Sequence, residues 1–219
     1  MEPIIAIHKP KGPTSHDIVA QIRKITGEKK VGHAGTLDPL ASGVLVVGIG
    51  REGTKQLRHI VEKEKEYLAT ILLGATSITD DAEGEKTAID VATPPSEATV
   101  RETLKHFVGT IQQVPPQYSA GKISGKEAYK YARAGQHVTL GAGTVDIFSI
   151  EFLEYAWPIV RCRVVTGPGV YIRSLARDLG ERLGTGGYLA DLERTRVGQY
   201  TLEDAIAPEA LEKKNPATL

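Results

Sequence analysis

The chain has 219 residues, with 27 basic and 27 acidic side chains and therefore no formal net charge. Its hydrophobic fraction of 41% and charged fraction of 25% are typical of a globular protein and exclude an intrinsically disordered one. Even the longest apolar runs, such as Val44 to Val47, are far shorter than the roughly 20 residues of a membrane-spanning helix. The amino terminus lacks the pattern of a signal peptide, and the single cysteine, Cys162, has no partner for an internal disulfide. We therefore expect a soluble cytoplasmic protein.

The first third of the chain alternates apolar strands with one clear amphipathic helix. Ile4 to Ile7 is predicted as a strand, and apolar residues then recur at helical spacing from Ser15, a good N-cap, to Gly27. The run from Lys29 to Gly43 has too many glycines for a helix and is predicted as a loop. The elements expected after it are a buried strand at Val44–Ile49, a short helix after Thr54 and a strand at Tyr67–Leu73.

The rest of the chain begins with an acidic loop, SITDDAEGE, at residues 77–85, and a helix capped by Ser96 and stopped at Gly109 follows it. The elements expected next are a helix at Lys126–Ala134, strands near Val145–Phe152 and Ile159–Thr166, a helix with apolar positions from Ile172 to Leu183, and a last strand at Arg194–Tyr200. Because strands and helices interleave without a regular βαβ repeat, an α+β fold on a mostly antiparallel sheet is favoured.

Charge is unevenly distributed along the chain despite the neutral total. Residues 1–65 hold 11 basic and 7 acidic side chains, whereas residues 66–119 hold 3 and 8. The fold could gather the basic stretches on one face, as a nucleic-acid partner requires. The alternative is ordinary solvated surface charge.

The segment with the most chemical information is GHAGTLDPLASG, residues 32–43. Pro39 disfavours helical geometry for Asp38, so the carboxylate is expected to project from an extended loop. Leu37 and Leu40 flank this acid, which is an unusual setting for a charged group. An aspartate in such a place could act as a nucleophile or a general base. The alternative is that the Asp-Pro pair only forms a turn.

Six motifs occur along the chain in a fixed order. They are KPKGPTS at residues 9–15, VGHAGTLDPLASG at 31–43, KEYLATILLG at 65–74, TDDAEG at 79–84, VPPQYSA at 114–120 and GVYIRSLARDLG at 169–180. Together they resemble the TruB family of bacterial tRNA pseudouridine synthases, over about residues 4 to 200. The resemblance implies the pseudouridine synthase fold, an α+β fold with a central, mostly antiparallel mixed sheet flanked by helices and loops.

The resemblance implies the isomerisation of one uridine in the T-loop of tRNA, conventionally nucleotide 55, to pseudouridine. The glycosidic bond breaks, the uracil turns while it is held, and C5 is joined to the ribose C1′. The base must first be flipped out of the folded loop, which costs a few kcal/mol. Because nothing is oxidised, no cofactor and no metal are expected. The partner expected is the T-stem-loop of tRNA, without a membrane, and the protein is expected to be a monomer.

Three residues match the catalytic positions of this family. Asp38 matches the catalytic aspartate, and the sequence leaves open whether it adds to the base, attacks C1′ or removes a proton from C2′. Each route needs an ionised carboxylate, and Arg173 matches the family's partner for it. Tyr67 matches the aromatic residue that stacks on the flipped base, and its hydroxyl is a candidate for proton transfer.

Other residues match positions that bind the substrate. His33 matches the residue that fills the gap left in the RNA stack, and Leu192 matches an apolar wall of the base pocket. Asp81 and Tyr171 match positions that contact the nucleotide. The candidates for phosphate contacts are Lys9, Lys11, Lys122, Lys126, Arg194 and Arg196.

The resemblance predicts a catalytic domain over residues 1–200 and a short C-terminal tail over 201–219, too short for the family's small RNA-binding (PUA) domain. We therefore expect a reduced grip on the acceptor side of tRNA. Two other functions stay open: a tRNA-folding chaperone that needs no chemistry, and a guide-RNA-dependent synthase, which relies on an appended domain and protein partners. Without the resemblance, a carboxylate-based hydrolase is the alternative.

Overall fold

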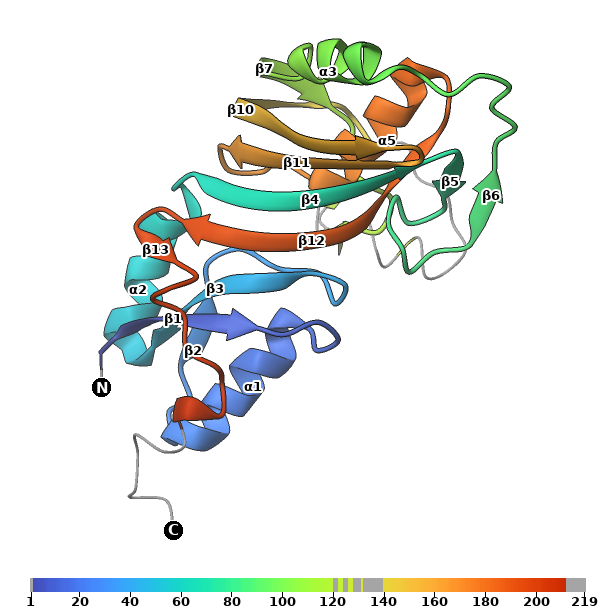
Figure 1. The fold of residues 1–219 in the computed structure, drawn as a ribbon. Helices are drawn as coiled ribbons and strands as arrows, with labels where there is room; N and C mark the ends of the chain where they lie inside the picture. The colour runs from blue at the N-terminus through green and yellow to red at the C-terminus, as the bar shows by residue number, and fades with distance from the viewer. Residues whose placement is uncertain (1, 120–121, 124–125, 128–130, 132–139, 212–219) are drawn as a thin grey trace. The chain divides into compact units, whose positions relative to one another are not determined.

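The computed structural model describes residues 2–119, 122–123, 126–127, 131 and 140–211 (Figure 1). The chain forms two compact units. The first consists of Met1–Leu68 together with Leu192–Leu219, and the second of Ala69–Asp191. The chain passes from one unit to the other within two strands, β4 (Lys65–Leu73) and β12 (Gly187–Val197).

The first unit is built on the pairing of β1 (Ile4–Lys9) with β3 (Ser42–Ile49), which run antiparallel. β3 also pairs with β12, and this pairing is parallel through Ser42–Glu193 and Gly43–Arg194. Two shorter strands complete this part of the sheet: β2 (Val31–His33) pairs with β3, and β13 (Tyr200–Thr201) pairs with β12.

The helix α1 (Ser15–Thr26) starts one residue earlier than its predicted cap implies. Thr14 is the N-cap, because its hydroxyl accepts from the backbone N–H of Asp17 while the Asp17 carboxylate accepts from the Thr14 N–H. The Ser15 hydroxyl instead forms hydrogen bonds with the backbone of Leu37, in the loop between β2 and β3. At the other end Gly27 adopts the left-handed conformation and closes the helix as predicted.

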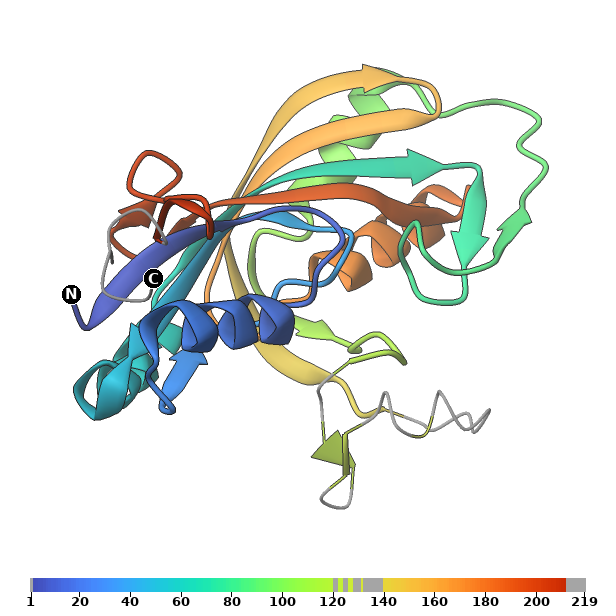
Figure 2. The same cartoon turned by 90° about the horizontal axis from the view of Figure 1, so that it is seen from below.

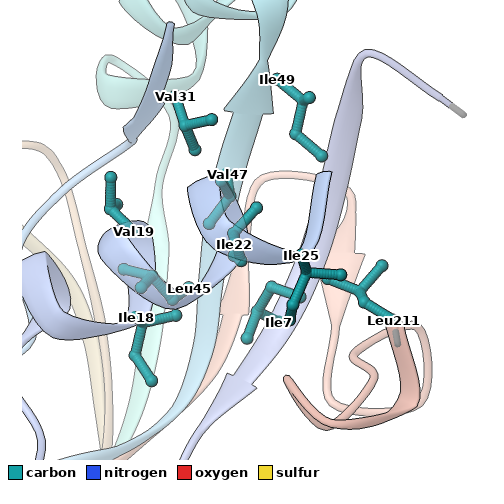
Figure 3. Close-up of a cluster of buried hydrophobic side chains, with 10 residues drawn as sticks. All are labelled: Ile7, Ile18, Val19, Ile22, Ile25, Val31, Leu45, Val47, Ile49 and Leu211. Carbon is teal, nitrogen blue, oxygen red and sulfur yellow. The ribbon is translucent and has the colours of Figure 1, made fainter. Parts of the chain in front are cut away.

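β3 is buried on both faces, which explains why its sequence is almost continuously apolar. One face packs against α1 in a cluster shown in Figure 3. Its members are Ile7, Ile18, Val19, Ile22, Ile25, Val31, Leu45, Val47, Ile49 and Leu211. The other face packs in a second cluster that includes Val44, Val46 and Leu57 of α2 (Gly50–Val61). Because Leu211 is buried in the first cluster, the segment predicted as a tail contributes to the core of this unit.

The second unit continues the strand order from β4 to β11, β10 and β7. Figure 2 shows β10 and β11 as a long curved hairpin. The elements of this unit are β5 (Ala75–Ser77), β6 (Lys86–Ala88), α3 (Glu97–Lys105), β7 (Gly109–Gln113), β8 (Lys122–Ile123), β9 (Lys126–Glu127), β10 (Gly143–Ala156), β11 (Ile159–Thr166) and α5 (Ile172–Leu183). Ser96 caps α3, as predicted.

The predicted fold class is confirmed. The β1–β3, β10–β11 and β7–β10 pairings are antiparallel and the β3–β12 pairing is parallel, so the sheet is mixed and mostly antiparallel. Helices accompany the strands in both units. Within the described ranges, no helix is both long and apolar enough to cross a bilayer.

Three predicted elements need correction. The loop expected at Lys29–Gly43 contains β2, which forms because its backbone pairs with β3. The start of the helix expected at Lys126–Ala134 is wrong, because Lys126–Glu127 pairs with Lys122–Ile123 as a strand. Most of the remaining residues of that predicted helix lie outside the described ones. The strand expected from Arg194 begins earlier, as β12 at Gly187.

The α1 cluster generates a stability prediction. Ile22 is fully buried there, so Ile22→Ala removes apolar contacts and leaves a cavity. We expect the free energy of unfolding to fall by about 2–5 kcal/mol. Urea denaturation of both proteins measures the change. Lys24→Ala, on the exposed side of the same helix, is the control and should change it by less than about 0.5 kcal/mol. Equal losses for the two variants would contradict this description of the core.

Candidate active site

Asp38 lies in the irregular loop between β2 and β3, residues 34–41. The loop ends in a turn, because the N–H of Ala41 donates to the Asp38 carbonyl at 3.1 Å, with Pro39 in the second position of the turn. Leu37 is buried, whereas the Asp38 residue is partly exposed. The predicted turn is therefore present, and it holds Asp38 at a partly exposed position.

The start of α1 supplies hydrogen-bond partners for the loop backbone. The Ser15 hydroxyl accepts from the Leu37 N–H at 2.9 Å and donates to the Leu37 carbonyl at 3.0 Å. The N–H of Gly12 donates to the Pro39 carbonyl at 2.8 Å. Residues of the motif KPKGPTS therefore hydrogen-bond the backbone of the motif that contains Asp38. The first motif thus supports the conformation of the second.

Lys9 also supports the loop. Its side chain is fully buried, and the ammonium donates to the carbonyls of Ala41 at 2.7 Å and Pro10 at 2.8 Å. This placement corrects the prediction that Lys9 contacts a phosphate, because that contact requires an exposed ammonium. The burial of the ammonium is compensated by these hydrogen bonds, which also satisfy two backbone carbonyls inside the unit.

Arg194 on β12 is the largest of the fully buried side chains. Its Nε donates to the Val44 carbonyl at 2.8 Å and its Nη2 to the Gly35 carbonyl at 3.0 Å. A longer contact of 3.4 Å joins Nη1 to the Thr36 carbonyl. The phosphate contact predicted for Arg194 is therefore also corrected, because the whole guanidinium faces the loop from inside the unit.

Tyr67 and Asp38 both interact with this guanidinium. Tyr67 lies on β4 and is 7% exposed, and its side chain makes a hydrogen bond with Arg194. Burial lowers the pKa of Arg194, while the Tyr67 hydroxyl and the Asp38 charge favour the protonated form. Two of the three predicted catalytic residues therefore affect the charge state of one buried arginine.

His33 and Leu192 are also in the first unit. His33 ends β2, and its ring meets that of His16 edge-on, with 5.6 Å between the ring centroids. Burial lowers the pKa of His33, helped by His16 and Arg194, whereas a hydrogen bond to the Gly35 backbone acts in the opposite direction. The neutral imidazole is therefore favoured. Leu192 is buried on β12, and its role as an apolar wall stays a prediction.

Arg173 lies in the first turn of α5, in the second unit, and its side chain is 7% exposed. Its Nη1 is 3.6 Å from Oδ2 of Asp81, which is also buried, and donates to the Thr79 carbonyl at 3.2 Å. Its Nη2 donates to the Tyr118 carbonyl at 3.0 Å. The structure brings Arg173 and Asp81 together, which the sequence did not predict. Because Asp38 belongs to the first unit, its predicted pairing with Arg173 stays a prediction.

Tyr171 immediately precedes α5 and is held by Gln113, a residue that sequence reasoning missed. The Gln113 side chain accepts from the Tyr171 N–H at 2.8 Å and donates to its carbonyl at 3.1 Å. A second missed pair joins Arg177 to Asp80 at 2.9 Å. Spacing in the sequence could have indicated these two ion pairs. Arg173 and Arg177 are four residues apart and share a helix face, and the two aspartates, Asp80 and Asp81, are adjacent.

The remaining candidates for phosphate contacts differ in their surroundings. Lys11 is exposed, whereas Arg196 forms an ion pair with Glu64. Of Lys122 and Lys126 the structure describes the backbone alone. Among the described residues, no three His, Cys, Asp or Glu side chains gather as a metal ion requires.

Family models and solved structures place this chain among known proteins. Residues 23–172 match the N-terminal domain of the TruB family pseudouridylate synthases, and residues 173–216 match the tRNA pseudouridylate synthase B C-terminal domain. Two solved structures cover 93% and 96% of the chain, with TM-scores of 0.73 and 0.71 and identities of 33% and 30%. They are a Cbf5–Nop10–Gar1 complex and an H/ACA RNP bound to a substrate RNA, and the chain spans 51% and 52% of the matching chains.

Curated relatives named tRNA pseudouridine synthase B are similar over almost the whole chain. The protein of Thermobifida fusca is 47% identical over 216 residues, which are 95% of this chain and 73% of the relative. That of Corynebacterium diphtheriae is 48% identical over 222 residues, or 97% and 73%. That of Parabacteroides distasonis is 46% identical over 218 residues, or 95% and 91%. With the Asp38 loop and its supporting residues in place, these matches show that the chain belongs to the TruB family of pseudouridylate synthases.

Proposed function

We propose that this protein isomerises the T-loop uridine of tRNA, nucleotide 55, to pseudouridine, with Asp38 as the catalytic residue. The observation that carries the proposal is the loop that holds Asp38, whose backbone is hydrogen-bonded from inside the unit by Ser15, Lys9 and Arg194. The relatives named tRNA pseudouridine synthase B support tRNA as the substrate class. In this proposal the protein acts as a cytoplasmic monomer on the T-stem-loop of tRNA and uses no metal or cofactor.

In this proposal the target uridine leaves the RNA stack and its base lies against the Tyr67 ring. Stacking on an aromatic side chain stabilises a flipped base by roughly 1–3 kcal/mol, which offsets much of the cost of flipping. Leu192 forms an apolar wall of the pocket, and His33 in its neutral form enters the gap that the base leaves. The Asp38 carboxylate then acts on the base, on C1′ or on the C2′ proton, and the glycosidic bond is remade to C5.

Arg173, Asp81 and Tyr171 contribute to the same reaction in the proposal, Arg173 as the partner of the Asp38 carboxylate. The Asp81–Arg173 pair and its carbonyl partners support this role, because they fix the guanidinium in one orientation. We also propose that residues 1–200 form the catalytic part of the chain, and that residues 201–219 are a short C-terminal segment whose Leu211 packs in the core of the first unit.

Asp38→Asn tests the reaction most directly. The amide keeps the shape of the side chain but has no negative charge, so we expect no detectable pseudouridine. The assay uses an unmodified tRNA transcript, with pseudouridine mapped by nucleotide, and tRNA affinity is measured in parallel. Retained affinity with no conversion supports the proposal. Conversion at the wild-type rate would contradict it, and tight binding by a wild-type protein that converts nothing would favour the chaperone.

Tyr67→Phe tests the hydroxyl, because it keeps the ring for stacking. We expect tRNA affinity to change by less than about threefold and the single-turnover rate to fall by about 100-fold, the lower range of general acid–base catalysis. Tyr188→Phe, a partly exposed tyrosine of the second unit, is the control. A near-normal rate in Tyr67→Phe would remove the hydroxyl from the mechanism.

Arg173→Lys keeps the positive charge but replaces a planar fork by a point charge. The ammonium cannot reproduce the contacts with Asp81 and two carbonyls, so we expect the single-turnover rate to fall by about 100-fold. Arg182→Lys, at an exposed position of the same helix, should leave the rate unchanged. Wild-type turnover by Arg173→Lys would show that the guanidinium geometry is not functional.

A further inference from the structure

Arg194 reaches the Asp38 loop from a distant part of the chain. It is separated by 150 to 159 residues from the three carbonyls that it contacts. Those carbonyls lie on both sides of Asp38: Gly35 and Thr36 precede it, and Val44 follows it. One rigid group therefore holds both ends of the segment that carries the carboxylate.

The backbone is shaped to admit this contact. Gly43 pairs with Arg194 across the parallel β3–β12 ladder and has a φ of +107°. A Cβ built on Gly43 would come within 2.2 Å of the Arg194 carbonyl oxygen. The glycine thus lets β12 approach β3 closely at the residue where the guanidinium must enter the loop.

A buried guanidinium is costly unless hydrogen bonds compensate for lost water. Here the compensation comes from the loop carbonyls and from Tyr67. Arg194 thus also interacts with Tyr67, a predicted catalytic residue on β4. The negative charge of Asp38 favours the protonated form of Arg194. A lysine could supply the charge but not several donors in one plane.

From these contacts we infer that Arg194 is a positioning residue for the proposed reaction, which fixes the Asp38 loop and the Tyr67 hydroxyl relative to each other. It acts through these two residues and does not itself contact RNA. The inference rests on the proposed function for its effect on rate. Its effect on the loop is independent of any activity.

The test compares Arg194→Lys and Arg194→Gln with a matched control. Arg23→Lys is the control, because Arg23 also donates to a backbone carbonyl of the first unit, that of Val31 at 2.9 Å, away from the Asp38 loop. Hydrogen–deuterium exchange is followed over residues 34–44, together with thermal unfolding, tRNA affinity and the single-turnover rate of pseudouridine formation.

We expect the Leu37 and Ala41 amides to exchange at least about tenfold faster in Arg194→Lys, with exchange in α1 unchanged. The single-turnover rate should fall by about 100-fold, because small misplacements of reacting groups have effects of this size, while tRNA affinity stays within about threefold. Arg23→Lys should change neither loop exchange nor rate.

Each other outcome has a definite meaning. Unchanged exchange in folded Arg194 variants would overturn the inference, whether or not the wild-type protein is active. A wild-type rate in such variants would also overturn it. Global unfolding of both variants would assign Arg194 to the stability of the whole unit instead of the loop, and so overturn it too. A wild-type protein that forms no pseudouridine refutes the proposed function, and loop exchange then still decides whether Arg194 positions the loop.

Discussion

The structure of the first unit depends on one requirement: backbone carbonyls that are buried outside helices and sheets must still receive hydrogen bonds. The Asp38 loop cannot pair as a strand along its length, because Gly35 and Pro39 interrupt the pattern. Its polar groups are therefore satisfied one by one, by Ser15, Lys9 and Arg194. An aspartate on such a loop has a fixed position without belonging to any regular element.

In the second unit, too, a buried arginine donates hydrogen bonds to backbone carbonyls outside helices and sheets. Arg173 is buried like Arg194, and it also binds backbone carbonyls, those of Thr79 and Tyr118. The difference lies in the carboxylate partner, because Asp81 lies 3.6 Å from Arg173. In both units a long cationic side chain on a regular element orders an irregular loop. A strand therefore carries Arg194 and a helix carries Arg173, while the carboxylate proposed to act on the substrate, that of Asp38, lies on a loop.

Much of this architecture could be predicted from the sequence, because hydrophobic periodicity and helix-capping residues act locally. The α1, β3 and β11 segments follow directly from spacing and from residues such as Gly27. The roles of Lys9 and Arg194 could not be predicted, since a basic residue in a sequence suggests a surface contact. Their burial follows from long-range packing, which brings β12 beside β3. Likewise Gln113 gives no local signal, because its partner is the backbone of Tyr171.

The discontinuity of the first unit bears on how the protein is made. The second unit is one continuous stretch of chain, inserted between the two parts of the first. As the chain leaves the ribosome, the Asp38 motif emerges early, yet Arg194 follows more than a hundred residues later. Domains tend to fold in the order in which they are completed, and non-local contacts form late. A nascent chain thus carries the Asp38 motif without its support, so the loop gains its final order only after β12 has been made.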